Sequence, residues 1–528
     1  MLEIDTGEVF LQITFDTGSG LITKDFPRET LTRRNVDELA KYGIVFDTVN
    51  PKNLLDYLQY CEAKAPISKC HKQLGWSKIG DQTVFRGTEL IKPPSVKEES
   101  KYVGGIDTSP SGTMKAWLTM FKSQVLNSPQ LLMVTMFALA SPVLGILNET
   151  HDLGCMLLSL SNISSTGKTT AAMLAASTFS NPKMNAGLCI TYNATTNALV
   201  KYASMASGHP LILDEAVITT ASDITKQLYT LCAGRDKLRC DKESELKEVL
   251  TFSSMIISTA EFPLVDEKST SGIKARVYEI DQNMTNSAEH ADAIKNSVLQ
   301  NYGHVGPKLV KFILDKKLSS IETDYKTAQA EITEKIGTAE GLIPRVISKI
   351  AIVLLTAHYF SEAFKIDIDF TMFVEYICRI IRQVERISNC GETLIDILLQ
   401  EMLLRLNKFI IPSMFDHDLW GGIEGFYNVV DDDTFEFGIL TTVADELFRR
   451  NEIGNYKQVL KQLKAEGILI GEADRLSKRM VLNKNSGRQK CYVFRIKGDT
   501  AIMNKVKDHA NPEKTTEVSY AEFESVIE

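Results

Sequence analysis

The sequence lacks the features that mark several specialised classes of protein. Its nine cysteines include no C-x-x-C pair, so neither a zinc ribbon nor a disulfide framework is indicated. No basic segment followed by an apolar one opens the chain, so we expect no signal peptide. The most apolar run, residues 131–147, is interrupted by Pro142 and is too short to span a bilayer, which favours a buried core helix. We therefore expect a cytoplasmic protein with no membrane segment.

Basic residues are outnumbered by acidic ones. The 528 residues include 59 Lys and Arg against 67 Asp and Glu, a formal net charge of −8. This balance argues against a wholly basic nucleic-acid coat protein, so any contact with nucleic acid must come from local patches. Hydrophobic residues make up 44% and charged residues 24%, as in ordinary folded proteins.

Composition and periodicity predict a multidomain α/β protein. A small α+β region comes first, and apolar runs then alternate with helical patterns, which predicts a parallel sheet covered by helices. A helical region, a last folded region and an acidic flexible tail follow. The predicted boundaries are 1–110, 111–340, 341–410, 411–497 and 498–528.

Two local predictions accompany this division. Residues 43–49 have a strand-like composition, and a helical pattern follows them at 51–63. Within the helical region, Gly391 is the expected break between two helices.

Residues 155–177 carry the strongest functional signal. A buried-strand run leads into a Ser/Thr-rich loop that ends in Gly-Lys-Thr, and a helix-forming run follows. This is the context of a phosphate-binding P-loop, because successive backbone amides and the helix N-terminus then face the phosphates. Lys168 is expected to contact the β- and γ-phosphates, and Thr169 to bind Mg²⁺. The predicted nucleotide-binding residues are Asn162, Ser164, Ser165, Thr166, Gly167, Lys168, Thr169 and Thr170.

Asn162 is a departure from the P-loop pattern G-x-x-x-x-G-K-[ST], which begins with glycine. Asn readily adopts a positive φ, so we expect it to preserve the shape of the loop. The alternative is a Ser/Thr-rich helix cap that merely contains Gly-Lys-Thr. We favour the P-loop over this alternative, because the strand, the loop and the helix all agree with a P-loop.

A short apolar strand ending in adjacent carboxylates gives a second signal. Residues 210–215 read Pro-Leu-Ile-Leu-Asp-Glu, far enough after Lys168 to leave room for two helices and a strand. Asp214 is predicted to complete the Mg²⁺ site, and Glu215 to orient the attacking water for hydrolysis. Without a P-loop before it, we would interpret the same pair as solvated carboxylates at the end of a strand.

Three further residues are candidates for contacting the γ-phosphate. The strand at 251–260 ends in hydroxyls, of which Thr259 is favoured over Ser258. Arg276, at the start of the next strand, suits a finger that reaches the ATP of a neighbouring subunit, although a surface arginine before an edge strand fits equally well. Arg345, which opens the helical region, is another candidate.

These motifs resemble a family of helicase-like ATPases from phages, plasmids and staphylococcal cassette elements, the domain of unknown function 927, whose relatives are called cassette chromosome helicases. Asn162 and Ala260 stand where glycine is expected in that family. The resemblance implies an AAA+ core that uses ATP and Mg²⁺, a homo-hexameric ring and a C-terminal winged helix. The matching positions are Trp117 and residues 164–170, 195–199, 213–215, 234–237 and 258–261.

The C-terminal region contains the basic patch that the overall charge requires. Residues 438–497 include 13 Lys or Arg and 6 Asp or Glu. A helix at 455–466 is expected to bury Leu460 and Leu463 and to expose its lysines, and a basic hairpin follows, which together outline a winged helix. A winged fold used only for packing is the alternative. The predicted contacts with duplex DNA are Lys478, Arg479, Lys484, Arg488 and Lys490.

A second basic segment, residues 234–242, lies between the Asp-Glu strand and the Ser-Thr strand. Ring motors of this type insert a hairpin there that points into the channel, where it can grip single-stranded DNA. An ordinary solvated loop is the alternative, because Asp236 and Asp241 interrupt the positive charge. The predicted contacts are Arg235, Lys237, Arg239 and Lys242.

Two functions from different classes fit these features. The first is an ATP-dependent helicase-like motor that acts on DNA in the replication of a phage or mobile genetic element, together with a replication or loading partner. The second is a non-motor AAA+ ATPase that remodels proteins or acts as a nucleic-acid-binding switch. Stimulation of ATP hydrolysis by single-stranded DNA distinguishes them. Glu215 argues against a third reading, a P-loop kinase.

Overall fold

The structure is a computed structural model of the chain. It describes residues 1–510 except for 5–6, 19, 217–223, 239–245, 247–248, 266–268, 338–340, 389, 412–421, 432, 451–455, 473–474, 485–486 and 499. The chain divides into two compact units. The core unit comprises Met1–Val265 and Ser271–Val384, and the C-terminal unit comprises Asp266–Thr270 and Glu385–Glu528.

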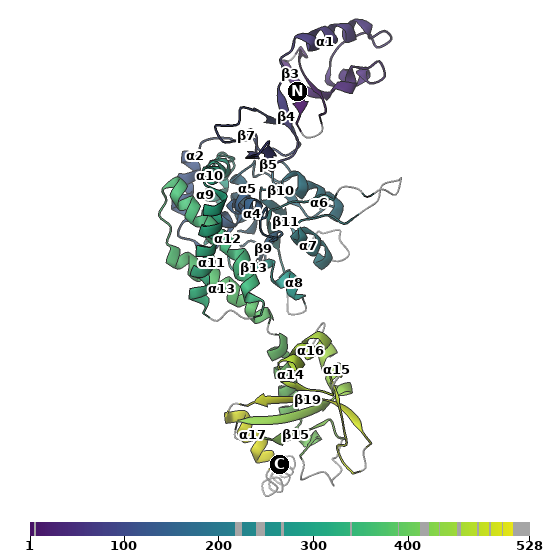
Figure 1. The fold of residues 1–528 in the computed structure, drawn as a ribbon, viewed down its shortest axis with the longest axis vertical. Coiled ribbons are helices and arrows are strands. Elements are labelled where there is room, and N and C mark those ends of the chain that lie inside the picture. Colours follow the sequence, from purple (N-terminus) through teal and green to yellow (C-terminus); the bar gives the residue numbers. More distant parts are fainter. Residues whose placement is uncertain are drawn as a thin grey trace. The chain divides into compact units, whose positions relative to one another are not determined.

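A five-stranded parallel sheet with the strand order β10-β11-β12-β9-β13 organises the core unit (Figure 1). All residues of β9, β11, β12 and β13 are buried. Because alternate side chains point to opposite faces, both faces of these strands are covered. This confirms the predicted parallel sheet. The strands are β9 (Met156–Ser161), β10 (Cys189–Thr191), β11 (Leu211–Asp214), β12 (Met255–Ala260) and β13 (Val277–Ile280).

Helices from both sides of the P-loop in sequence pack into one core with this sheet. α3 packs against α5, α12 and β12, and α5 packs against α9. The helices are α2 (Met114–Met120), the π-helical η3 (Phe121–Val125), α3 (Pro129–Leu139), α4 (Ser141–Leu147), α5 (Lys168–Ser177), α6 (Thr196–Met205), α7 (Ile224–Ala233), α8 (Ser271–Lys274), α9 (Ala288–Val298), α10 (Val305–Leu314), α11 (Leu318–Ile336), α12 (Ile343–Phe364) and α13 (Phe370–Ser388).

Two helical segments of this core have the length and apolar composition of a membrane span. α12 is long and apolar enough to cross a bilayer, and α3 with α4, bent by 45°, meets the same criterion as a pair. However, 78% of the apolar window of α12 is buried within the protein. Residues 131–147 belong to the hydrophobic core, as the sequence predicts.

Small sheets and one helix form the N-terminal part of the core unit. Residues 43–49 were expected to form a strand, and this prediction is wrong. Val45 and Val49 are 95% and 94% exposed, and the Asp47 carboxylate accepts hydrogen bonds from the amides of Val49 and Asn50, which closes a turn instead. The elements are β1 (Leu2–Glu3), β2 (Phe10–Asp16), β3 (Leu21–Pro27), η1 (Arg28–Leu31), η2 (Val36–Tyr42), α1 (Lys52–Lys64), β4 (Lys69–His71), β5 (Gly75–Ile79), β6 (Gln82–Arg86), β7 (Leu90–Ile91) and β8 (Lys101–Tyr102).

The C-terminal unit has its own core around a sheet of order β14-β15-β16-β19-β17, with β18 paired to β19. Leu460 and Leu463 are buried in this core, as predicted. The elements are α14 (Cys390–Leu404), η5 (Leu406–Lys408), β14 (Phe409–Ile410), β15 (Gly425–Val429), β16 (Thr434–Leu440), α15 (Thr441–Arg450), α16 (Tyr456–Ala465), β17 (Leu469–Ile470), β18 (Lys478–Met480), β19 (Gln489–Lys497) and α17 (Thr500–Ala510).

Two expectations about the C-terminal half need correction. The predicted helical region 341–410 is divided between two cores, because α12 and α13 pack in the core unit whereas α14 packs in the C-terminal unit. The expected break near Gly391 is present, because α13 ends at Ser388 and α14 begins at Cys390, although Gly391 itself is the second residue of α14. A further break follows α12 at Lys365, which is left-handed with φ 51°. The predicted flexible tail begins with α17, whose Met503 and Val506 are buried. Residues 511–528 lie outside the described chain.

Candidate nucleotide-binding site

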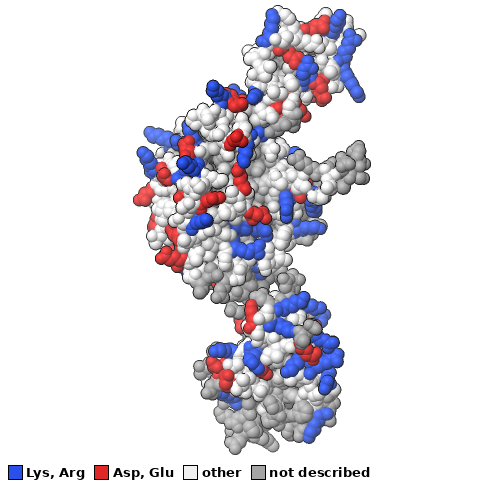
Figure 2. Space-filling model, in the orientation of Figure 1, with Lys and Arg blue, Asp and Glu red and all other residues white. Residues whose placement is uncertain are grey.

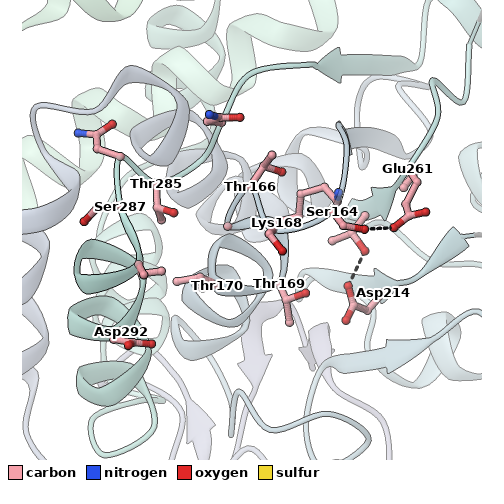
Figure 3. A pocket seen from close by; sticks show the side chains of 18 of the residues that line it. Ser164, Thr166, Lys168, Thr169, Thr170, Asp214, Glu261, Thr285, Ser287 and Asp292 are labelled. Atoms are coloured by element: carbon pink, nitrogen blue, oxygen red, sulfur yellow. Dashed lines mark hydrogen bonds between the residues drawn. The ribbon is translucent and has the colours of Figure 1, made fainter.

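The P-loop joins the end of β9 to the start of α5 at the carboxyl edge of the sheet. Gly167 has φ 84°, and a Cβ atom there would lie 2.5 Å from Thr285 Oγ1, so glycine is required both for the backbone path and for the approach of Thr285. All residues from Ser164 to Thr170 line a cavity of about 750 Å³ (Figure 3). The structure therefore brings seven of the eight predicted nucleotide-binding residues together.

Asn162, the eighth residue, does not have the positive φ that we expected from its place in the P-loop pattern. The left-handed residues of the loop are Ser165 and Gly167, so Asn162 does not supply a positive φ. Its side-chain amide donates to the carbonyl of Asp281 at 2.9 Å and to Oδ1 of Asn283 at 3.2 Å. Asn162 therefore ties the P-loop to the segment that follows β13, a contact that glycine could not make.

Lys168 is the only basic residue among those that line the cavity in the described chain. Its ammonium group donates to the carbonyl of Asn162 and, at 2.7 Å, to that of Ile163. Burial lowers the pKa of Lys168, and the carboxylates of Glu261 and Asp214 oppose this by raising it. The lysine thus provides a positive charge between the loop and two carboxylates.

Thr259, at the end of β12, holds the Asp-Glu pair in place. Its hydroxyl donates to Asp214 Oδ1 and accepts from the backbone amide of Glu215 at 2.9 Å. Asp214 and Thr259 are 4% and 3% exposed. Glu215 has φ 60°, a strained value for a residue other than glycine, and its exposed side chain lines the cavity. Contact of Thr259 with a γ-phosphate stays a prediction, whereas Ser258 is buried and bonded to Tyr192.

The donor set fits Mg²⁺ held partly by a substrate. No group of three or more His, Cys, Asp or Glu side chains in the described residues could hold a metal alone. Mg²⁺ commonly uses one or two protein oxygens together with phosphates and water. The hydroxyl of Thr169 and the carboxylate of Asp214 both face the cavity and are suited to this mode of binding.

Glu261, which follows β12, is a cavity residue to which sequence reasoning assigned no role. Its Oε1 accepts a hydrogen bond from the hydroxyl of Ser164 in the P-loop (Figure 3). Asp214 and Glu261 lie at the same end of the cavity (Figure 3). The other end, near Thr285 and Asp292, is formed by the loop after β13 and by α9.

Arg276 and Arg345 lie near the opposite edge of the sheet and do not line the cavity. The carbonyl of Arg276 accepts from the amide of Leu157 near the start of β9. The buried Nε of Arg276 has no hydrogen-bond partner among the described residues. Both arginines act electrostatically on Lys349 of α12. Burial, Arg276 and Arg345 together lower the pKa of Lys349 to about 8. Neither arginine therefore contacts the nucleotide cavity of its own chain.

The predicted channel hairpin begins at that same edge. Antiparallel pairing joins Arg235 to Thr251, and the amide of Asp236 donates to the carbonyl of Leu250 at 2.8 Å. The side chains of Arg235 and Lys237 are exposed. Arg239 and Lys242 lie outside the described residues. The described part is thus the base of a hairpin, and its contact with DNA stays a prediction.

The predicted wing is the strand pair β18 and β19. Arg479 and Lys490 are directly opposite in this antiparallel pair, so their side chains share one face. All five predicted duplex contacts, Lys478, Arg479, Lys484, Arg488 and Lys490, are exposed. The α16 lysines differ from one another, because the half-buried ammonium group of Lys464 donates to the carbonyls of Glu472 and Arg475. Space-filling Figure 2 shows Lys and Arg gathered on the C-terminal unit.

Two family profiles match the chain. The family described as "Domain of unknown function (DUF927)" matches residues 2–250, which include the P-loop and the Asp-Glu strand, and the "Cch helix turn helix domain" matches residues 390–499. The chain is thus similar to the DUF927 family over residues 2–250.

A solved structure entitled "SCCmec type IV Cch - active helicase" shares this fold. It has 24% sequence identity with the chain and a TM-score of 0.74, and the match covers 95% of this chain and 93% of that one. Curated proteins yield no match. The match to the Cch helix turn helix domain begins at the start of α14, in agreement with the packing of α14 in the C-terminal unit.

Proposed function

We propose that this protein is a Mg²⁺- and ATP-dependent DNA helicase of the AAA+ type, which works as a homo-hexameric ring in the replication of a phage or mobile genetic element. One observation carries the proposal: the P-loop, the Asp214–Glu215 pair and Thr259 converge on one cavity at the carboxyl edge of a parallel sheet. In that sheet β12 lies between the P-loop strand and the Asp-Glu strand.

The side chains around the cavity divide the work of ATP hydrolysis. Lys168 and the amides at the start of α5 bind the β- and γ-phosphates. Thr169 and Asp214 would hold Mg²⁺, which would supply positive charge to neutralise the phosphates. Glu215 orients the attacking water and accepts its proton, and Thr259 fixes the position of Glu215 through its backbone amide. This arrangement favours transfer to water, as in a motor, over transfer to a second substrate.

Two basic elements provide separate contacts with DNA in this proposal. The exposed wing binds duplex phosphates, and the hairpin that begins at Arg235 grips a single strand in the channel. Arg276 acts on the nucleotide of the neighbouring subunit, because the cavity of its own chain lies at the other edge of the sheet. The name of the structurally similar Cch protein, an active helicase, supports this function.

ATP hydrolysis with and without single-stranded DNA tests the proposal. We expect single-stranded DNA to accelerate hydrolysis and the protein to separate a forked duplex. Lys237→Ala should reduce both effects while leaving basal hydrolysis unchanged. If single-stranded DNA leaves the rate unchanged and no duplex is separated, the non-motor remodeller becomes the better reading.

The wing is tested by duplex affinity measured against salt. Replacing Lys478, Arg479 and Lys490 by Ala should weaken duplex binding, and the slope of log affinity against log salt should fall by about 0.9 for each lost phosphate contact. Basal hydrolysis should not change, since the wing contributes nothing to the cavity. An unchanged salt slope would assign the wing to packing alone.

A further inference from the structure

The nucleotide cavity extends beyond the residues that hydrolysis requires. Its second end is made by the loop after β13 and by the start of α9, on the far side of the P-loop from Asp214 and Glu261 (Figure 3). The residues of interest at this end are Thr285, Asn286, Ser287, Ala288, Ala291 and Asp292.

The direction of a bound nucleotide follows from the proposed function, on which this inference rests. The carboxylates that direct water lie at one end, so the γ-phosphate belongs there. The phosphate chain then follows the P-loop and the N-terminus of α5. The nucleoside must consequently occupy the second end, against α9.

Contacts with the P-loop hold this end in position. The amide of Met284 donates to the carbonyl of Thr166 at 2.8 Å, and Asn162 bonds to Asp281 and Asn283. The hydroxyl of Ser287 caps α9 by accepting from the amide of His290. A segment ordered before binding loses little conformational entropy when a ligand arrives, which suits a recognition surface.

The surface of α9 has one polar group available for recognition. Ala288, Ala291 and Asp292 are spaced i, i+3 and i+4 and share a face of the helix. The two alanines leave room for a ring. Asp292 is exposed and has no hydrogen bond or ion pair among the described residues. Among the described residues, no Lys or Arg lines this end, so a phosphate on the ribose would find no counter-charge.

We propose that the Asp292 carboxylate accepts hydrogen bonds from the ribose hydroxyls of the nucleotide, so that the site selects ribonucleoside triphosphates over their deoxy forms. An ionised carboxylate is an acceptor only, and the adjacent 2′- and 3′-hydroxyls of ribose are a pair of donors. A charge-assisted hydrogen bond of this kind contributes about a tenfold or greater difference in affinity.

Calorimetric titration of the full chain with ATP, 2′-deoxy-ATP and 3′-deoxy-ATP, each with Mg²⁺, tests this assignment. The intact protein should bind at least one deoxy nucleotide about tenfold more weakly than ATP. Asp292→Ala should bring the three affinities together: it should weaken ATP most and each deoxy nucleotide less, because a deoxy nucleotide has already lost one of the two hydroxyls. Equal binding of all three by the intact protein, or discrimination that persists in Asp292→Ala, would overturn the proposal.

Two variants separate this inference from the proposed function. Glu289→Ala removes the same charge from the same helix but at a position that does not line the cavity, and it should retain discrimination. Lys168→Ala should weaken all three nucleotides alike. If the intact protein binds none of them, the proposed ATPase itself fails, whereas binding without discrimination overturns only the role of Asp292.

Discussion

Glu279 of β13 is a buried carboxylate at the base of the P-loop. Its Oε2 accepts from the hydroxyl of Ser161 at 2.6 Å, and its Oε1 accepts from the amides of Leu264 and Val265 at 2.7 and 3.1 Å. Glu279 is 5% exposed, and burial raises its pKa to about 7 although these hydrogen bonds oppose the shift. Glu279 therefore couples the support of the P-loop to pH.

The pH dependence of Glu279 has a defined sign. The folded pKa near 7 exceeds the ordinary value of 4.5, so the folded state binds the proton more tightly. The contribution to stability is full below pH 4.5 and is lost as pH rises through 7. Glu279→Gln keeps acceptors and a donor but cannot ionise. As pH rises through 7, the free energy of unfolding of the intact protein should fall by on the order of 3 kcal/mol through Glu279, and the variant should not show this fall.

Urea unfolding of both proteins at pH 5 and pH 8 measures this effect. From pH 5 to pH 8, the free energy of unfolding should fall more for the intact protein than for Glu279→Gln. A difference in unfolding free energy that is the same at both pH values would mean that Glu279 does not titrate in this range. Other ionisable groups cancel in the comparison, because they are common to both proteins.

Replacing Lys168 and replacing Glu215 should affect different steps, ATP binding in the first case and ATP hydrolysis alone in the second. Lys168→Ala removes the charge that binds phosphate, so both binding and hydrolysis of ATP should be lost. Glu215→Gln should retain binding and reduce hydrolysis by about 100-fold or more, since only the orientation and deprotonation of water are affected. Nucleotide binding and phosphate release measure the two steps separately. Normal hydrolysis by Glu215→Gln would point to another carboxylate, and Glu261 is the neighbouring one.

The sequence revealed the residues that form a contiguous motif and missed those that depend on distant contacts. Ser164 to Thr170 could be recognised because strand, loop and helix adjoin. The role of Asn162 could not, since its partner Asp281 lies 119 residues away. Asp292 carries no local signal either, because an exposed acid on a helix is ordinary in any sequence.

Elements were easier to predict than their packing partners. Periodicity identified α12 and α14 as helices, but it says nothing about which of two cores receives each helix. The turn closed by Asp47 shows the same limit, because a side-chain acceptor competed successfully with a strand-like composition.

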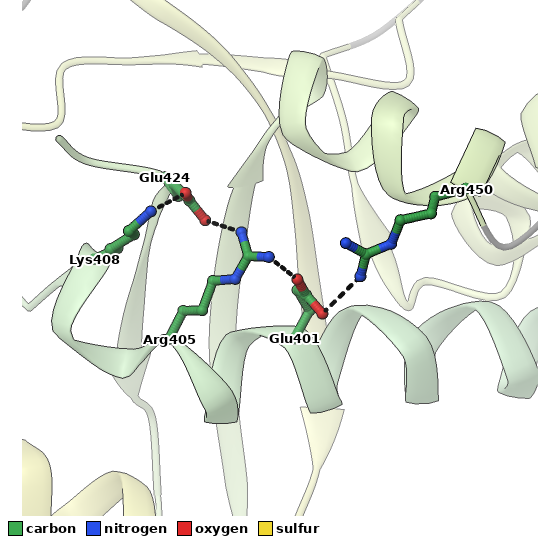
Figure 4. Close-up of polar contacts among 5 residues, drawn as sticks. All are labelled: Glu401, Arg405, Lys408, Glu424 and Arg450. Atoms are coloured by element: carbon green, nitrogen blue, oxygen red, sulfur yellow. Dashed lines mark hydrogen bonds and ion pairs between the residues drawn. The ribbon is translucent and has the colours of Figure 1, made fainter. Parts of the chain in front are cut away.

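A network of ion pairs attaches α14 to the rest of the C-terminal unit (Figure 4). Glu401 of α14 pairs with Arg405 and with Arg450 at the end of α15. Glu424, just before β15, pairs with Arg405 and Lys408. The side chain of Glu401 is 13% exposed, so this charge is more sheltered than that of a typical surface pair.

Glu401→Gln should destabilise the C-terminal unit by about 1–3 kcal/mol, because two arginines lose their shared carboxylate. Hydrogen exchange in α14 and α15 measures the effect locally, and exchange in β9 to β13 should not change. Asp433→Asn is the matched control. Its pair with Lys497 is exposed, at 64% and 81% for the two side chains, and should contribute under about 1 kcal/mol. Equal protection in all three proteins would mean that the network does not stabilise α14.

For the whole molecule, the two edges of the core sheet have different chemistry. The carboxyl edge carries the P-loop, Asp214 and the cavity. The opposite edge carries Arg276, Lys349 and the base of the hairpin that begins at Arg235. A subunit cannot bring its own Arg276 to its own nucleotide, so the proposed finger requires a neighbour, and a ring supplies one to every site.

Mixing two inactive variants tests this arrangement. Arg276→Ala should bind ATP normally and hydrolyse it poorly, whereas Lys168→Ala retains the arginine but lacks a working P-loop. In rings assembled from equal amounts of both, about a quarter of the interfaces combine an intact P-loop with an intact neighbouring arginine, if subunits mix at random. ATP hydrolysis should therefore recover to about a quarter of the intact rate, measured as phosphate release from the mixture.

Glu215→Gln mixed with Lys168→Ala provides the control. Lys168 and Glu215 line one cavity within one chain, so every site in such a ring lacks one of them and no activity should return. Recovery in the first mixture and none in the second would follow from an arginine that acts across the subunit boundary. If neither mixture recovers, although sedimentation shows that mixed rings form, Arg276 does not complete the neighbouring site. The guanidinium of Arg276, which donates to the carbonyl of Gly272, would then have only a structural role at this edge of the sheet.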